Sequence, residues 1–96
     1  MARFDVYRLR GMYLLDCQSD RLSELKTRFV VPLLPIGEVP RVNRLNPIFS
    51  VDGEQLVMAT QLGSPVTALQ LRDPVTSLVD AHAAVIDAFD TLLTEY

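Results

Sequence analysis

The dipeptide Asp52-Gly53 constrains the fold of this chain more than any other local feature. It joins two short apolar segments, residues 48–51 and 54–58, and both of its residues suit the positive φ angles of a two-residue type I′ turn. A turn of this type fixes the register of a hairpin. The expected facing pairs are Val51 with Glu54, Phe49 with Leu56, and Ile48 with Val57. Both faces then carry apolar pairs, so we expect one face to pack on the core and the other against a helix or a second subunit.

Two further parts of the chain have strand patterns. Residues 3–9 alternate in polarity, Arg10-Gly11 suits a turn, and residues 13–17 are mostly apolar, which predicts a first hairpin. Residues 28–34 are apolar and β-branched and predict another strand, in which Pro32 lacks a donor and so indicates a bulge or a sheet edge. The polar residues 18–27 predict an exposed loop or a single helical turn.

The C-terminal part of the chain predicts a helix that begins at Asp73-Pro74. Aspartate is a good N-cap acceptor, and proline is favoured at the first helical position. Apolar residues then recur at three-and-four spacing over about five turns, and such a stripe should be buried. The stripe consists of Val75, Leu78, Val79, Val85, Ile86, Phe89, Leu92 and Leu93. His82 falls on it, and we expect this side chain to pack in the core or at an interface rather than to act as a general base.

The length of the chain predicts a single domain, residues 1–96. The longest apolar run, residues 29–36, is far shorter than the roughly 20 residues that cross a bilayer, so we expect no membrane association. Arg3 and Asp5 stand where a secretory signal needs an apolar core. The single cysteine, Cys17, cannot form an internal disulfide and lies in a strand pattern, which favours a packing role and a reducing, cytoplasmic location.

Bases and acids are unevenly distributed along the chain. Residues 1–44 hold eight Lys and Arg residues against five acids, whereas residues 45–96 hold one base against seven acids. The net charge of −3 and the pI near 4.9 do not favour direct binding of nucleic acid, which needs clustered bases. The basic half suits an acidic protein segment, or it forms a solvated face.

The sequence carries no motif for catalysis, for a cofactor or for a metal. It has no Gly-rich phosphate loop, no Cys-x-x-Cys, no metal-spaced cluster of His and carboxylates, and no Gly-x-Ser-x-Gly. Arginines with a carboxylate can cleave RNA without histidine, and Arg28 or Arg44 with Glu38 would be the candidates here, although their spacing does not single them out. We therefore expect a protein that is not an enzyme and needs no cofactor.

A series of short matches along the chain resembles the CcdB toxins of toxin–antitoxin modules. The matches keep the order and spacing of that family over nearly the whole chain. They are Phe4-x-Val6-Tyr7, Tyr13 to Asp16, Gln18-Ser19-Asp20, Arg28-x-Val30-Val31-Pro32-Leu33, Leu45-x-Pro47, Gly53, Met58-x-Thr60 and Pro65-Val66. The resemblance implies a mostly β fold, an SH3-like barrel of antiparallel strands with a small extra sheet and a C-terminal helix, paired as a symmetric homodimer.

The resemblance also implies a function that depends on binding. Family members trap DNA gyrase in its cleavage complex at the enzyme's breakage subunit, and the disordered C-terminal segment of an antitoxin neutralises them. Gyrase-poisoning members end in Trp-Gly-Ile, whereas this chain ends in Leu93-Thr94-Glu95-Tyr96. By their position at the helix end, the candidate partner-binding residues are Asp90, Leu93, Thr94, Glu95 and Tyr96. Because antitoxin tails tend to be acidic, the candidates for antitoxin binding are Arg8, Arg10 and Arg28.

Three hypotheses follow from these observations. The first is a toxin that binds and poisons DNA gyrase, acting with an altered helix tip. The second is a non-toxic CcdB homologue that keeps the dimer and the antitoxin-binding surface in a regulatory role. The third is an endoribonuclease similar to the MazF toxins, which share the barrel.

Overall fold

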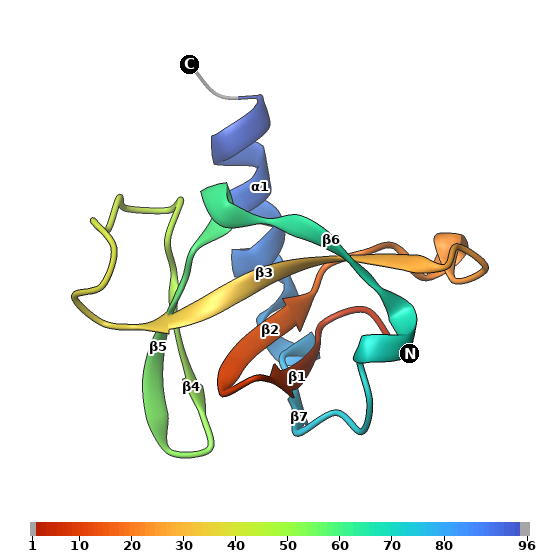
Figure 1. The fold of residues 1–96 in the computed structure, drawn as a ribbon. Helices are drawn as coiled ribbons and strands as arrows, with labels where there is room; N and C mark the ends of the chain where they lie inside the picture. Colours follow the sequence, from red (N-terminus) through yellow and green to blue (C-terminus); the bar gives the residue numbers. More distant parts are fainter. Residues whose placement is uncertain (1, 95–96) are drawn as a thin grey trace.

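The computed structural model describes residues 2–94, which form a strongly curved antiparallel sheet and a C-terminal helix (Figure 1). The strands are β1 (Asp5–Leu9), β2 (Met12–Asp16), β3 (Thr27–Pro35), β4 (Ile48–Val51), β5 (Glu54–Met58), β6 (Ser64–Thr67) and β7 (Thr76–Ser77). Short 3-10 helices lie at η1 (Asp20–Leu22), η2 (Thr60–Leu62), η3 (Ala68–Gln70) and η4 (Val79–Ala81), and the α-helix is α1 (His82–Leu93).

The long strand β3 organises the sheet. The strand order is β4-β5-β3-β2-β1-β7, and β6 branches off by pairing with the first half of β3. The second half of β3 pairs with β5, while its middle pairs with β2 on the other side. The sheet curls into a nearly closed barrel, which confirms the predicted SH3-like barrel with a C-terminal helix. The predicted small extra sheet is not separate, because β6 belongs to the same hydrogen-bonded sheet as a branch on β3.

Both predicted hairpins are confirmed in position, and the register predicted for the second is confirmed as well. Asp52 and Gly53 have φ angles of 51° and 79°, and the facing pairs of β4 and β5 are those that a two-residue turn requires. Arg10 and Gly11 have φ angles of 54° and 80° and connect Leu9 directly to its partner Met12. Left-handed conformations at both positions match the strand twist, which explains why these dipeptides determine the register.

Pro32 lies inside β3 but at neither a bulge nor a sheet edge, so that prediction was wrong. Its carbonyl accepts the N–H of Ala59 at 2.9 Å, and in an antiparallel strand the nitrogen of the same residue faces the same side. On that side the pairing with β6 ends at Val30 and the pairing with β5 begins at Leu33. The missing N–H therefore falls where the partner strand changes, and no ladder bond is lost.

The predicted helix start at Asp73-Pro74 was also wrong. Thr76 and Ser77 pair with Val6 and Asp5 of β1 instead, and α1 begins only at His82. Two flanking backbone hydrogen bonds extend this pairing: Val75 N–H donates to Val6 of β1, and Leu78 N–H donates to Phe4, just before β1. A favourable N-cap contributes only about 1 kcal/mol, so hydrogen bonding to the exposed edge of β1 overrides the local signal.

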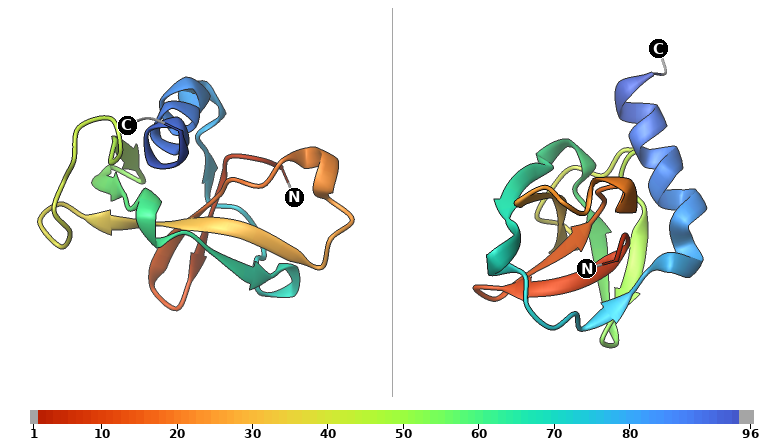
Figure 2. Two further views of the ribbon diagram at one scale, coloured as in Figure 1. Left: turned by 90° about the horizontal axis from the view of Figure 1, so that it is seen from above. Right: turned by 90° about the vertical axis from the view of Figure 1, so that its right-hand side faces the viewer.

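The main core lies between the inner face of the barrel and α1 (Figure 2). Val85 and Ala88 are fully buried there, and Ile86 and Phe89 pack against the cluster. The predicted stripe is thus only half buried, because Val79, Leu92 and Leu93 remain exposed in the single chain. His82 is exposed as well, with its ring 6.3 Å from that of Phe4, so it does not pack in the core. No helix among residues 2–94 is long and apolar enough to cross a membrane.

Candidate functional site

An apolar surface is exposed where the end of α1 passes the barrel. It is formed by Phe29, Ile86, Phe89, Asp90, Leu92 and Leu93, and we call it the helix-end surface. Together with Arg3 and Cys17 these residues line a depression of about 360 Å³. The C-terminal end of α1 projects past the strands, which leaves this surface open (Figure 2).

Large apolar side chains dominate the helix-end surface. Leu93 is 72% exposed, Leu92 40% and Phe29 37%, and the Phe29 ring lies 6.2 Å from that of Phe89 at a tilt of 59°. Arg3 and Asp90 supply charges at the border. An apolar centre with a charged border is typical of a protein interface.

Gly63 sets the position of Phe29 in this surface. A Cβ atom at Gly63 would lie 2.6 Å from Cζ of the Phe29 ring and 2.7 Å from Cε2. Because no side chain can occupy that space without moving the ring, only glycine at this position keeps Phe29 in its present place.

Two of the residues predicted at the helix end, Asp90 and Leu93, lie on this surface. Thr94 is exposed beside them, and its hydroxyl donates to the carbonyl of Asp90 at 2.8 Å. The predictions for Glu95 and Tyr96 lie outside the described residues. Phe29 and Arg3 were missed, because a strand pattern does not indicate which strand end will lie beside the helix.

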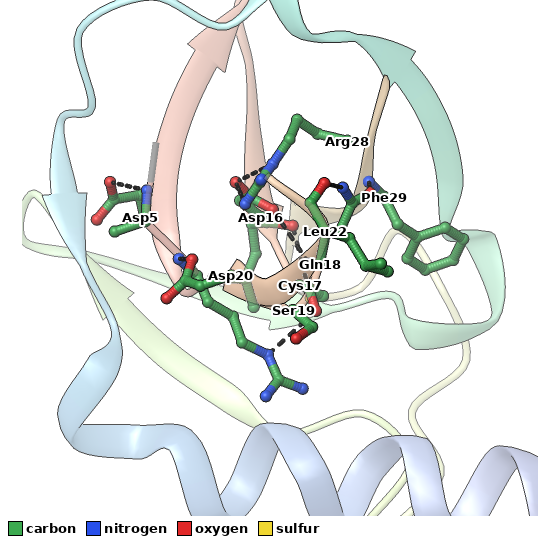
Figure 3. A network of polar contacts seen from close by, with 12 residues as sticks. Asp5, Asp16, Cys17, Gln18, Ser19, Asp20, Leu22, Arg28 and Phe29 are labelled. Atoms are coloured by element: carbon green, nitrogen blue, oxygen red, sulfur yellow. Dashed lines mark hydrogen bonds and ion pairs between the residues drawn. The ribbon is translucent and has the colours of Figure 1, made fainter. Parts of the chain in front are cut away.

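A buried ion pair lies behind the helix-end surface (Figure 3). Arg28 Nε donates to Asp16 Oδ2 at 2.9 Å, and Arg28 Nη2 lies 2.7 Å from the same oxygen. The other carboxylate oxygen accepts the backbone N–H of Gln18, whose side-chain oxygen accepts the N–H of Phe29. These bonds fix residues 16–18 against the start of β3, and so position the Cys17 and Phe29 side chains that line the surface.

The ion pair places Arg28 in the interior rather than on a binding surface. Its side chain is 1% exposed and that of Asp16 is 0% exposed. Burial raises the pKa of Asp16, while the hydrogen bonds from Arg28 and Gln18 oppose that change. The prediction that Arg28 contacts an antitoxin requires an accessible guanidinium, and its burial contradicts this.

Arg8 and Arg10 are exposed, at the end of β1 and in the turn that follows it. They line a second pocket together with Glu38. Arg44 instead binds Asp87 of α1 through two hydrogen bonds, of 3.0 and 2.6 Å. Arg28 and Arg44 therefore do not surround Glu38, and the ribonuclease arrangement considered above is not assembled.

The reactivity of the Cys17 thiol tests whether this side chain is buried beside the helix-end surface. Burial raises the pKa of this thiol to about 12, with the charge of Asp16 adding to the effect. We expect alkylation of Cys17 at pH 8 to be at least 100-fold slower in the folded protein than in the protein unfolded by urea, because only the thiolate reacts. Mass spectrometry of iodoacetamide-treated samples measures both rates, and equal rates would contradict the buried position.

Within residues 2–94 no group of three or more His, Cys, Asp or Glu side chains could hold a metal ion. The described residues form a small antiparallel barrel with a C-terminal helix. Residues 3–95 match the family model described as CcdB protein, and the chain therefore belongs to the CcdB family. A comparison with curated protein sequences finds no match.

Proposed function

We propose that this CcdB-family toxin acts by binding and poisoning DNA gyrase rather than by catalysing a reaction. The observation that carries the proposal is the helix-end surface, which lies at the end of α1, where the resemblance to gyrase poisons places their gyrase-binding tip. Membership of the family over residues 3–95 supports the toxin role. The apolar side chains at this surface suit insertion into a protein cleft.

We further propose a homodimer that works in the cytoplasm, is neutralised by a cognate antitoxin, and binds neither nucleic acid nor a membrane. The exposed apolar residues Val75 and Val79, which precede α1 and lie outside the helix-end surface, support a paired subunit because a second copy would cover them. The antitoxin contacts are assigned to Arg8 and Arg10, the two predicted arginines that are exposed.

A second candidate function is that of a non-toxic homologue with an antitoxin-binding or regulatory role. The observation in its favour is that residues 94–96 are Thr, Glu and Tyr, where the resemblance places the Trp-Gly-Ile of gyrase poisons. A tryptophan at the centre of an interface contributes about 2–4 kcal/mol, so its replacement weakens binding unless other side chains compensate.

Induced expression in bacterial cells distinguishes the two functions. We expect growth to stop soon after induction, with DNA broken in complexes with gyrase, because a poison acts at low copy number. Viable counts before and after induction measure the effect, with an empty vector as the control. Unimpaired growth at high expression would favour the non-toxic homologue.

A further inference from the structure

The loop of residues 36–47, which joins β3 to β4, is bound to the side of α1 by one arginine (Figure 1). Arg44 Nε donates to Asp87 Oδ2 at 3.0 Å, and Nη2 donates to Oδ1 at 2.6 Å. The hydrogen bonds from Arg44 hold the pKa of Asp87 below its ordinary value, so the carboxylate is ionised at neutral pH. Two parallel hydrogen bonds between planar groups fix their relative orientation as well as their distance.

The end of this loop is a rigid support for Arg44. Asn46 is fully buried, and its side-chain nitrogen donates to the carbonyl of Met58 at 3.0 Å and to the side chain of Gln61 at 2.8 Å. Its side-chain oxygen accepts the N–H of Val42 at 2.9 Å. These bonds attach both ends of the segment 42–46 to the end of β5 and to η2, and Arg44 lies between them.

The backbone of Arg44 has a left-handed conformation, with a φ angle of 69°. Residues other than glycine rarely adopt this conformation, and they keep it only where the surrounding structure holds them. Glycine would adopt it without strain, so the backbone alone does not account for an arginine at this position. The contact of its side chain with α1 does.

The ion pair holds α1 from a different side than the helix-end surface. At 3.6 residues per turn, Asp87 extends from another side of the helix than Ile86 and Leu93. Neither Arg44 nor Asp87 lines the depression at the helix end. The helix packs on the barrel through residues such as Val85, and its C-terminal end projects past the strands (Figure 2). A second attachment from another direction therefore restricts the tilt of that projecting end.

We propose that Arg44 is a positioning residue for the helix-end surface: it holds Asp87 from the rigid loop end and so fixes the direction in which α1 presents Leu92 and Leu93 to a partner. The assignment rests on the proposed function in that the partner is the target bound at the helix end. A surface that already has its binding orientation loses less entropy on association, so the effect of Arg44 on binding is indirect.

Amide hydrogen exchange of the purified Arg44→Met variant tests the attachment without any partner. We expect the amides from Asp87 to Leu93 to exchange about threefold faster than in the unchanged chain, as suits an exposed bidentate pair. Arg72→Met is the matched control, because it removes the same charge from an exposed position before β7. It should leave these rates unchanged. Equal rates in Arg44→Met and the unchanged chain would overturn the proposal.

Exchange of the two charges separates the ion pair from other effects of the substitution. Arg44→Asp alone places two carboxylates beside each other and should speed amide exchange further than Arg44→Met does. Aspartate tolerates a left-handed backbone, so the double variant Arg44→Asp with Asp87→Arg can form the pair again. It should return the rates towards those of the unchanged chain, and a double variant as fast as Arg44→Asp alone would contradict the role of the pair.

Trapping of gyrase on supercoiled DNA tests the consequence for binding. Arg44→Gly relieves the left-handed backbone, so its stability in urea should stay close to that of the unchanged chain. We nevertheless expect Arg44→Gly and Arg44→Met to need about threefold more protein for half of the maximal trapping. Trapping by both variants at the unchanged concentration would overturn the positioning role. Faster amide exchange in Arg44→Met, with no trapping by the unchanged chain, would overturn the proposed function and not the attachment of α1 by Arg44.

Discussion

Replacement of Arg28 by methionine is expected to lower the free energy of unfolding by about 3–5 kcal/mol, because it leaves the Asp16 carboxylate buried and unpaired. Small domains have total stabilities of about 5–15 kcal/mol, so this one change should unfold a measurable part of the protein at room temperature. Urea unfolding followed by circular dichroism measures the loss. A loss below about 1 kcal/mol would show that the pair is not buried as described.

The matched control removes both charges at once. The double variant Asp16→Leu with Arg28→Met leaves no unpaired ion, so it should recover most of the stability lost by Arg28→Met alone. An equally unstable double variant would mean that packing around the side chains, and not the unpaired charge, accounts for the loss.

The stability of Arg28→Met should depend on pH in a direction set by Asp16. Without Arg28, burial raises the pKa of this carboxyl in the folded state above its ordinary value of 3.8 with less opposition. The folded state then binds a proton on Asp16 more tightly than the unfolded state does. The loss of stability caused by the buried charge is therefore absent below pH 3.8 and grows as the pH rises towards the folded-state pKa. Acidification from neutral pH should therefore restore part of the stability of this variant.

Replacement of Leu93 by aspartate is expected to abolish growth arrest while the fold is retained. Leu93 is 72% exposed on the helix-end surface, so the change costs little in the free chain. A carboxylate there must lose its hydration when the surface enters a partner. Together with the lost apolar contact, this should weaken binding by about 30-fold to 1000-fold.

Leu69 provides the control for that experiment. It is 84% exposed in η3 and lies outside the helix-end surface, so Leu69→Asp changes the charge equally. Cells that express Leu69→Asp should stop growing as they do with the unchanged chain. Growth arrest by both variants at equal protein levels would remove the helix-end surface from the mechanism.

The sequence predicts the strands better than the helix because turn chemistry is local. Asp52-Gly53 and Arg10-Gly11 adopt left-handed conformations in two-residue turns, and such turns fix the registers of the two hairpins. The helix start depends on competition between a local cap and the open edge of β1, which a pattern along the chain cannot reveal. The same limit applies to Pro32, because a pattern along the chain does not reveal that the strand beside β3 changes from β6 to β5 at this residue.

Only the residues of the candidate site that belong to the end of the helix were predicted from the sequence. Asp90 and Leu93 were found from their position at the helix end, whereas Phe29 lies beside them through the path of β3. Arg28 was interpreted as a surface base because charge counts do not register burial. Two features of the sequence could have indicated the ion pair. Asp16 directly follows the apolar Leu14-Leu15, and Arg28 stands at the start of an apolar strand, so both charges lie among residues that are buried.

Incubation of the purified protein with gyrase and supercoiled DNA tests most directly whether it acts by binding and trapping that enzyme. The amount of linear DNA released by denaturant, with a CcdB protein that ends in Trp-Gly-Ile as the positive control, reports the trapped cleavage complex. We predict an increase in linear DNA with the concentration of the protein and none with Leu93→Asp. Linear DNA at the level of gyrase alone, under conditions where the positive control responds, would contradict the account.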